Sequence, residues 1–213
     1  AAHRGRPGQQ LAHHRPGPRA PSPAPAPQRR PHFPVDDAAQ GDEAQALDLD
    51  QGRLAFGLAP DPVPATLIRP AEPGAVFELC PAIPGLCAAL AARAPLAALF
   101  IDYGHARLGH GDTLQAVAAH RFTDPLDAPG EADITAHVDF EALGREAKAV
   151  GLTASPVATQ RDFLFRLGLV ARAEALARAN PERFDSLRAG VERLIDPAPT
   201  GMGQLFKAMV LHT

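Results

Sequence analysis

The sequence has no run of about 18 consecutive apolar residues, which is the least that a helix needs to cross a bilayer. Its start also lacks the basic stretch, apolar core and small-residue cleavage site of a secretory signal. We therefore predict neither a membrane partner nor secretion, and we expect a cytoplasmic protein.

Cysteine is scarce, with only Cys80 and Cys87 in 213 residues. In the helix predicted for this segment they would lie roughly 10 Å apart along the axis, too far for a disulfide. Because a free cysteine behaves as a small apolar residue, we predict that both lie in the core.

Metal and nucleic-acid sites are not indicated either. Four histidines fall within 33 residues, but the paired cysteines and close ligand spacings of a zinc site are missing. These histidines are His105, His110, His120 and His137. The net charge is −3 and the folded part has no basic cluster, so we expect no nucleic-acid partner.

Acidic residues are absent from residues 1–35, which contain nine prolines and only three sizeable apolar side chains, Leu11, Phe33 and Val35. Such a segment cannot bury enough surface to offset its chain entropy, so we predict disorder over residues 1–46. Two explanations stay open, a solvated linker and a GC-rich gene translated out of frame. A mitochondrial transit peptide is disfavoured, because prolines this dense exclude the amphipathic helix that it needs.

Residues 47–213 have the composition of a folded domain. The segment from Asp48 to Leu58 predicts a strand or hairpin arm with a turn at Gln51-Gly52. A short strand is predicted from Ala75 to Leu79, and Pro84 can open a helix because its missing amide is not needed in the first turn.

The five apolar residues from Ala97 to Ile101 predict a strand covered on both faces and ended by Asp102. Further along, Asp139 is placed to cap a helix that Gly151 ends. The apolar residues of that helix recur on one face, namely Phe140, Leu143, Ala147 and Val150.

Residues 161–179 predict a second helical stretch with a break at Gly168, and Asn180-Pro181-Glu182 predicts the start of a third helix. Asp196-Pro197 would end it before a last strand at 204–211. The side chains expected to face inward are Phe163, Leu167, Val170 and Ala171, then Phe184, Leu187, Val191 and Leu194.

Short strands separated by helices predict an α/β fold with a mainly parallel sheet. In such sheets ligands bind outside the carboxyl ends of the strands. The segment from Asp102 to His105 is predicted to lie at such an end.

Five phrases now carry a resemblance: FIDYGH at 100–105, GDTLQAV at 111–117, HRFTDPLDAPGEADITAHVDFEAL at 120–143, TQRDFL at 159–164 and MGQLFKAMVL at 202–211. In this order they resemble the C-terminal half of the MidA family, S-adenosylmethionine-dependent methyltransferases that include the mitochondrial assembly factor for respiratory complex I. The resemblance covers about residues 47 to 213.

The resemblance implies a Rossmann-like class I methyltransferase sheet whose fifth strand is LFID, with a helical insertion from Arg161 to Ile195 before the last strand. It implies S-adenosylmethionine as cofactor and a protein, with arginine as the acceptor residue, as substrate. A complex I subunit is the implied partner, and a eukaryotic source implies a mitochondrial location.

The donor-binding parts of that family are not found in this sequence. A Gly-x-Gly loop that opens a helix after a strand is missing, because Gly201-Met202-Gly203 leads into a strand and the spacing of Gly104, Gly109 and Gly111 is wrong. We therefore expect no cofactor-binding residues here, and a fragment that is inactive alone.

Arginine methylation needs carboxylates or carbonyls that hold a flat fork of donors. The substrate-side candidates are Asp102, Tyr103, His105, Thr113, Gln115 and His137. Asp102 could instead fix a turn, and the polar residues at 113 and 115 could simply be an exposed strand face. His137 could line the pocket or bond to the insertion, whereas Asp139, Gln160 and Asp162 are better explained as helix caps.

Two functions from different classes are compatible with the sequence. The first is a protein methyltransferase represented by its C-terminal half. The second is a non-catalytic module whose helices from Arg161 to Ile195 bind a partner protein. An in-frame Gly-rich donor loop ahead of residue 48 would discriminate between them.

Overall fold

The computed structural model describes residues 43–50, 53–60, 75–107 and 109–213. Of the segment predicted to be disordered, residues 1–46, the first 42 residues lie outside this range. Strands β1 (Glu43–Asp50) and β2 (Arg53–Pro60) form an antiparallel hairpin, with Asp50 opposite Arg53 across the predicted turn. The hairpin is confirmed, and its first strand begins ahead of the boundary that we predicted near residue 46.

The central sheet has the strand order β7-β3-β10-β8, and β9 also pairs with β10. Its strands are β3 (Ala97–His105), β7 (Val138–Asp139), β8 (Thr153–Ala154), β9 (Ala158–Thr159) and β10 (Phe206–His212). Only the pairing of β3 with β7 is parallel among these described strands, so the prediction of a mainly parallel sheet is wrong for this part of the chain.

The reversal of β10 has a local cause. After β9 the chain enters the helical insertion, and both ends of the insertion are held together there. The Gln160 amide donates to the Leu194 carbonyl at 2.8 Å, and the Arg161 guanidinium donates to the Ile195 carbonyl at 3.1 Å. The chain therefore re-enters the sheet beside the point where it left, and it runs back antiparallel to β9.

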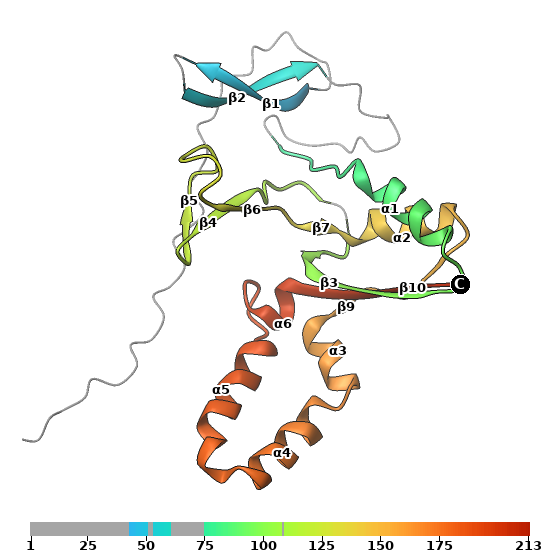
Figure 1. Cartoon of the computed structure of the whole chain (residues 1–213), viewed down its shortest axis with the longest axis vertical. Helices are drawn as coiled ribbons and strands as arrows, with labels where there is room; N and C mark the ends of the chain where they lie inside the picture. Colours follow the sequence, from blue (N-terminus) through green and yellow to red (C-terminus); the bar gives the residue numbers. More distant parts are fainter. Residues whose placement is uncertain (1–42, 51–52, 61–74, 108) are drawn as a thin grey trace, which may run out of the picture. The chain divides into compact units, whose positions relative to one another are not determined.

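Helices α1 (Ala82–Ala91) and α2 (Phe140–Ala149) pack on the same face of β3 and β10, as Figure 1 shows. Their buried side chains include Cys87, Phe140 and Leu143, which meet Met209 and Leu211 of β10. Asp139 caps α2 as predicted, accepting a hydrogen bond from the Ala142 amide at 2.9 Å, and Gly151 follows its end with φ of 84°. Val150 is 37% exposed and does not join the core face.

The opposite face of β3 is open in the described residues. Leu99 is 51% exposed and Ile101 is 44% exposed, whereas Phe100 between them packs against the core cluster. The prediction of a strand covered on both faces is therefore wrong here, and the strand continues beyond Asp102 to His105.

Two further predictions about the α1 region are wrong. Residues 75–80 form no strand, since the Glu78 side chain and the Val76 carbonyl instead bind the segment around Gly111 and Thr113. Cys80 precedes α1 and is exposed, and only Cys87 lies in the core.

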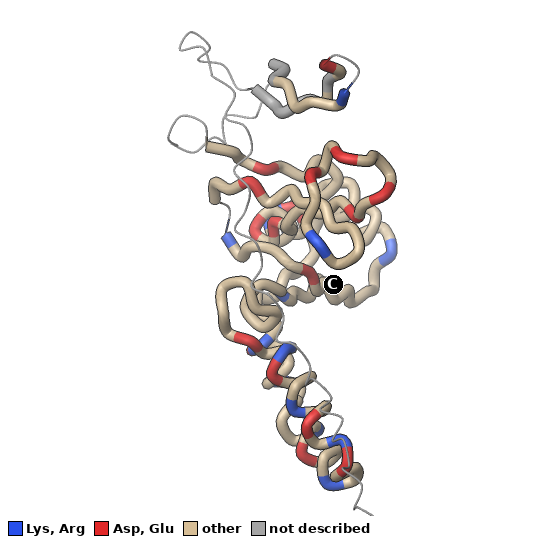
Figure 2. The backbone as a smooth tube through the Cα atoms, turned by 90° about the vertical axis from the view of Figure 1, so that its left-hand side faces the viewer, with Lys and Arg blue, Asp and Glu red and all other residues tan. Residues whose placement is uncertain are grey.

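The helical insertion, residues 160–195, contains α3 (Gln160–Arg166), α4 (Leu169–Ala179), the 3-10 turn η1 (Pro181–Arg183) and α5 (Phe184–Leu194). Gly168 separates α3 from α4 with φ of 80°, as predicted. The inward face predicted for the insertion is present only in part, because Leu167, Val170 and Phe184 are more than half exposed and neither α4 nor α5 has a fully buried residue. The half-buried members of the predicted face are Phe163, Leu187, Val191 and Leu194. Basic and acidic residues are interspersed along both helices (Figure 2), including the i,i+4 pairs Glu174–Arg178 and Arg188–Glu192.

The caps of the insertion also differ from the prediction. Thr159, rather than Gln160 or Asp162, caps α3, accepting a hydrogen bond from the Asp162 amide at 3.1 Å. The Asn180 side chain donates back to the Leu176 carbonyl instead of capping η1. One helical turn, α6 (Met202–Leu205), leads into β10.

A separate three-stranded antiparallel sheet, in the order β5-β4-β6, is formed by β4 (Gln115–Ala118), β5 (Arg121–Thr123) and β6 (Asp133–Thr135). Across the described parts of the chain, every helix is too short or too polar to span a bilayer.

We predict that Gly104→Ala destabilises the protein. A Cβ atom at this position would lie 2.2 Å from the Val138 carbonyl oxygen and 3.0 Å from the Phe140 ring, so β3 and β7 would have to separate. Overpacking of this kind typically costs about 1–3 kcal/mol. Urea unfolding should show the loss. Gly85→Ala is the control, because that position in α1 is open and Ala favours a helix by up to about 1 kcal/mol over Gly. Equal stability of Gly104→Ala and wild type would contradict the packing argument.

Candidate functional site

The carboxyl end of β3 can lie close to β7 because Gly104 has no side chain. The two strands pair in parallel, with Gly104 opposite Val138 and His105 opposite Asp139. This register places the end of β3 at the beginning of α2. The segment from Asp102 to His105 therefore lies at the strand end where the sequence predicted it.

Aromatic rings gather beside that strand end. The Tyr103 ring meets the Phe206 ring edge to face, with centroids 4.9 Å apart, and it lies 6.1 Å from the His137 ring. Three separate segments supply these rings, namely β3, β10 and the residue before β7. Two of the predicted candidates, Tyr103 and His137, are thus neighbours.

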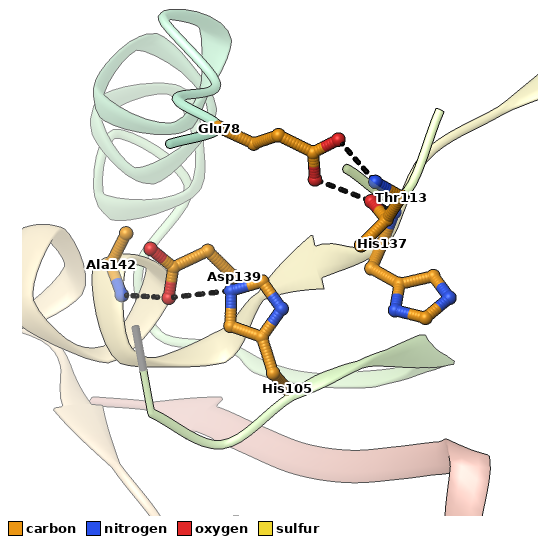
Figure 3. A network of polar contacts seen from close by, with 6 residues as sticks. All are labelled: Glu78, His105, Thr113, His137, Asp139 and Ala142. Carbon is orange, nitrogen blue, oxygen red and sulfur yellow. Dashed lines mark hydrogen bonds and ion pairs between the residues drawn. The ribbon is translucent and has the colours of Figure 1, made fainter. Parts of the chain in front are cut away.

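Glu78 holds the loop that carries Thr113. Its carboxylate accepts hydrogen bonds from the Thr113 and Leu114 amides at 2.7 and 3.2 Å and from the Thr113 hydroxyl. The Thr113 hydroxyl oxygen in turn accepts a hydrogen bond from the His137 amide at 2.9 Å. Figure 3 shows this chain of contacts from Glu78 to His137. Glu78 was not among the predicted site residues, because its only signal in the sequence is an acid within a stretch that predicts a short strand.

His105 and Asp139 form the other half of the network in Figure 3. The Nε2 atom of His105 lies 3.9 Å from Oδ1 of Asp139, the same oxygen that caps α2. Asp139 is buried, and the His105 side chain is 28% exposed. Asp139 therefore has a second neighbour besides the helix that it was predicted to cap.

The remaining candidates are less closely connected. Asp102 is exposed and accepts a hydrogen bond from its neighbour, the Tyr103 amide, at 2.8 Å, but it lies inside β3 rather than at a turn. Gln115 opens β4 and pairs with Thr135 in the separate sheet, so it is not brought to the strand end by any described contact.

Burial lowers the pKa of His137 below its ordinary value of 6.5, and the nearby His105 and Lys207 act in the same direction, whereas Glu78 and Asp102 oppose it. Burial also lowers the pKa of Lys207. The Lys207 ammonium donates to the carbonyls of Gln204 and, at 3.1 Å, Leu205. The sequence analysis missed Lys207, which is placed by the turn before β10.

Two of the helix starts in the described residues are closed to a ligand. The N-terminus of α2 already holds the Asp139 carboxylate, and Gly203 packs against the Ile195 backbone rather than leaving space for a ligand. Gly109 and Gly111 have open surroundings but lie in a coil that starts no helix. No cluster of three or more metal-binding side chains occurs in the described residues either.

A cavity of about 470 Å³ lies at the base of the helical insertion. It is lined by Arg161, Glu192, Arg193, Ile195, Asp196 and Pro197. None of the six predicted substrate-side residues lines it.

Comparison with known proteins identifies one family. Residues 32–157 match the model of a family described as putative S-adenosyl-L-methionine-dependent methyltransferases. The match begins at residue 32, within the segment that we predicted to be disordered.

Curated relatives are similar over most of the chain. The human protein arginine methyltransferase NDUFAF7, mitochondrial, is 34% identical over 182 residues, which is 81% of this chain and 41% of the relative. The mouse protein of the same name is 35% identical over 78% of this chain and 40% of its own length. The chain thus spans about two fifths of these relatives.

Solved structures show the same fold. A Burkholderia thailandensis protein with bound S-adenosyl-homocysteine superposes with a TM-score of 0.71 and 28% identity, over 82% of this chain and 48% of the other. A second structure from the same organism gives a TM-score of 0.69 and 26% identity.

We predict that His137 makes stability depend on pH. Because its pKa is lower in the folded state, the unfolded state binds more protons below about pH 6.5. The free energy of unfolding therefore falls as the pH drops from 6.5 toward the folded-state pKa, and it stays lower beneath that value. Urea unfolding at about pH 7.5 and about pH 5.5 measures this loss. The loss should be smaller in His137→Gln, whereas an unchanged loss would show that His137 titrates normally.

Proposed function

Since this chain belongs to a family of S-adenosyl-L-methionine-dependent methyltransferases, we propose that it supplies the acceptor side of a protein methyltransferase whose acceptor is an arginine side chain. The observation that carries this proposal is the proximity of the Tyr103 and His137 rings at the end of β3, where His105 lies opposite Asp139 and the exposed Asp102 precedes Tyr103. Ligands of α/β sheets bind at that edge.

The chemistry of these groups suits a guanidinium. Arginine presents a planar set of donors, which carboxylates accept and aromatic faces stack against. Asp102 offers an exposed carboxylate, and Tyr103 offers a ring that Phe206 holds in place. The curated relatives named above are protein arginine methyltransferases, which supports the same acceptor.

The donor is proposed to bind on a part of the fold beyond the described residues. Two features support this division. On the edge of β3 away from β10, no described strand pairs with residues 97–103, and the apolar Leu99 and Ile101 are exposed on one face. Unpaired strand edges and exposed apolar surface are normally covered in a stable protein. The chain alone is therefore proposed to be inactive.

We propose the compartment and the partner of this protein from the names of its relatives. The mitochondrial names of the relatives support a mitochondrial location for a eukaryotic source. For a bacterial source the cytoplasm stays our proposal. The resemblance to a family that includes a complex I assembly factor makes a complex I subunit the first acceptor to test.

A partner-binding role for the helical insertion is the second candidate. It is favoured by Leu167, Val170 and Phe184, which are apolar and more than half exposed. This role is compatible with catalysis, because an insertion beside the acceptor site could hold the substrate protein.

We predict that the 213-residue chain does not bind S-adenosylmethionine with low-micromolar affinity, because the start of α2 is occupied by Asp139 and Gly203 packs against the Ile195 backbone. Calorimetric titration measures this directly. The Burkholderia thailandensis protein, which was crystallised with S-adenosyl-homocysteine, is the positive control. Low-micromolar binding by the chain would overturn the division between donor and acceptor sides.

Transfer is tested with the protein at its full encoded length. Radiolabelled S-adenosylmethionine and complex I subunit peptides containing arginine should give labelled peptide, and the same peptides with lysine in place of arginine should not. Label on the lysine peptides alone would overturn the arginine assignment.

A further inference from the structure

We propose that His105 accepts the proton that leaves the acceptor nitrogen during methyl transfer, and that Asp139 is its positioning residue. This inference rests on the proposed function and assigns one of its chemical steps. It is carried by an unfulfilled polar contact at the end of β3.

The contact involves Nε2 of His105. This nitrogen is buried, and among the described residues it has no hydrogen-bond partner. A buried polar atom without a partner costs about 1–3 kcal/mol, so such atoms call for an explanation. Oδ1 of Asp139 lies 3.9 Å from this nitrogen, which is longer than a hydrogen bond. A rotation of the ring that shortens this distance would give the nitrogen an acceptor.

Asp139 can serve both neighbours at once. An ionised carboxylate accepts about four hydrogen bonds, and Oδ1 here receives the Ala142 amide at 2.9 Å. The capped helix holds the carboxylate at a fixed position opposite His105, since residues 105 and 139 are register partners. The helix cap thereby also orients the imidazole.

The orientation determines which ring nitrogen is basic. A carboxylate facing Nε2 favours a proton on that nitrogen, which leaves the lone pair on Nδ1. Nε2 has no exposed surface, so the 28% exposure of the side chain comes from its other atoms. Figure 3 shows the second ring nitrogen turned away from Asp139. Nδ1 is thus free to accept a proton.

The other ionisable groups near the strand end are already engaged. The Glu78 carboxylate accepts three hydrogen bonds, and the Lys207 ammonium donates to two carbonyls. The exposed Asp102 carboxylate is the group proposed above to hold the guanidinium. His137 has no carboxylate within ion-pair distance among the described residues, which distinguishes it from His105.

The proton balance of the step follows. The acceptor nitrogen takes the methyl carbon from the donor sulfur, which keeps the electron pair of the broken bond, and the nitrogen releases one proton. Nδ1 of His105 binds this proton with its lone pair. The imidazolium is stabilised by the Asp139 carboxylate at Nε2, and it later returns the proton to water.

A spectroscopic test needs no donor or acceptor. We expect the NMR spectrum of the chain to show a slowly exchanging Nε2–H proton of His105, absent in His105→Gln and shifted or broadened in Asp139→Asn. Asparagine caps helices as well as aspartate, so Asp139→Asn should leave α2 intact. His110→Gln, which changes an exposed histidine, is the matched control. An Nε2–H signal that is missing in wild type, or unchanged in Asp139→Asn, would overturn the pairing.

A kinetic test uses the protein at its full encoded length. We expect His105→Ala to lower kcat by about 100-fold with little change in KM, and added imidazole to restore part of the rate. Asp139→Asn should lower kcat by about tenfold, and His110→Gln should not change it. Wild-type kcat in His105→Ala, or no rescue by imidazole, would overturn the role of His105 and leave the proposed function standing. An inactive wild-type protein would instead overturn the proposed function.

Discussion

The close approach of Gly104 to the Val138 carbonyl is the contact on which the site depends. It fixes the parallel register of β3 and β7, and this register sets His105 opposite Asp139. The same approach lets the Phe140 ring pack fully buried beneath the strand end, so the beginning of α2 and the core are positioned together. The site residue His105 and the core residue Phe140 are therefore both positioned by the close approach at Gly104, and neither can shift without the other.

Features that depend on neighbouring residues could be predicted from the sequence. The Asp139 cap, the helix break at Gly168 and the hairpin around Gln51-Gly52 all follow from local backbone preferences, and the structure has each of them. Strand direction and burial depend on distant segments and could not be read in this way. Ala97 to Ile101 is uniformly apolar, yet burial alternates along it because only one face meets helices in the described chain.

The candidate site shows the same limit. Asp102 to His105 lie at the carboxyl end of β3, although inside the strand rather than after it, and Tyr103 and His137 prove to be neighbours. Glu78 was missed because its role is defined by partners 35 residues away, at Thr113. Gln115 was included on a polar alternation that belongs to the separate sheet. A sequence pattern identifies a strand end well, but it does not identify which remote side chains converge there.

The tied base of the helical insertion has a consequence for how this fold can diversify. Gln160 and Arg161 donate hydrogen bonds from the beginning of the insertion to the carbonyls at its end. The two ends of the insertion therefore stay close together, and the sheet keeps its geometry whatever the length of the chain between them. Lengthening a closed loop costs little, roughly 0.6 kcal/mol for each doubling. Natural variation can therefore replace or extend α4 and α5 while the residues at the end of β3 stay in place.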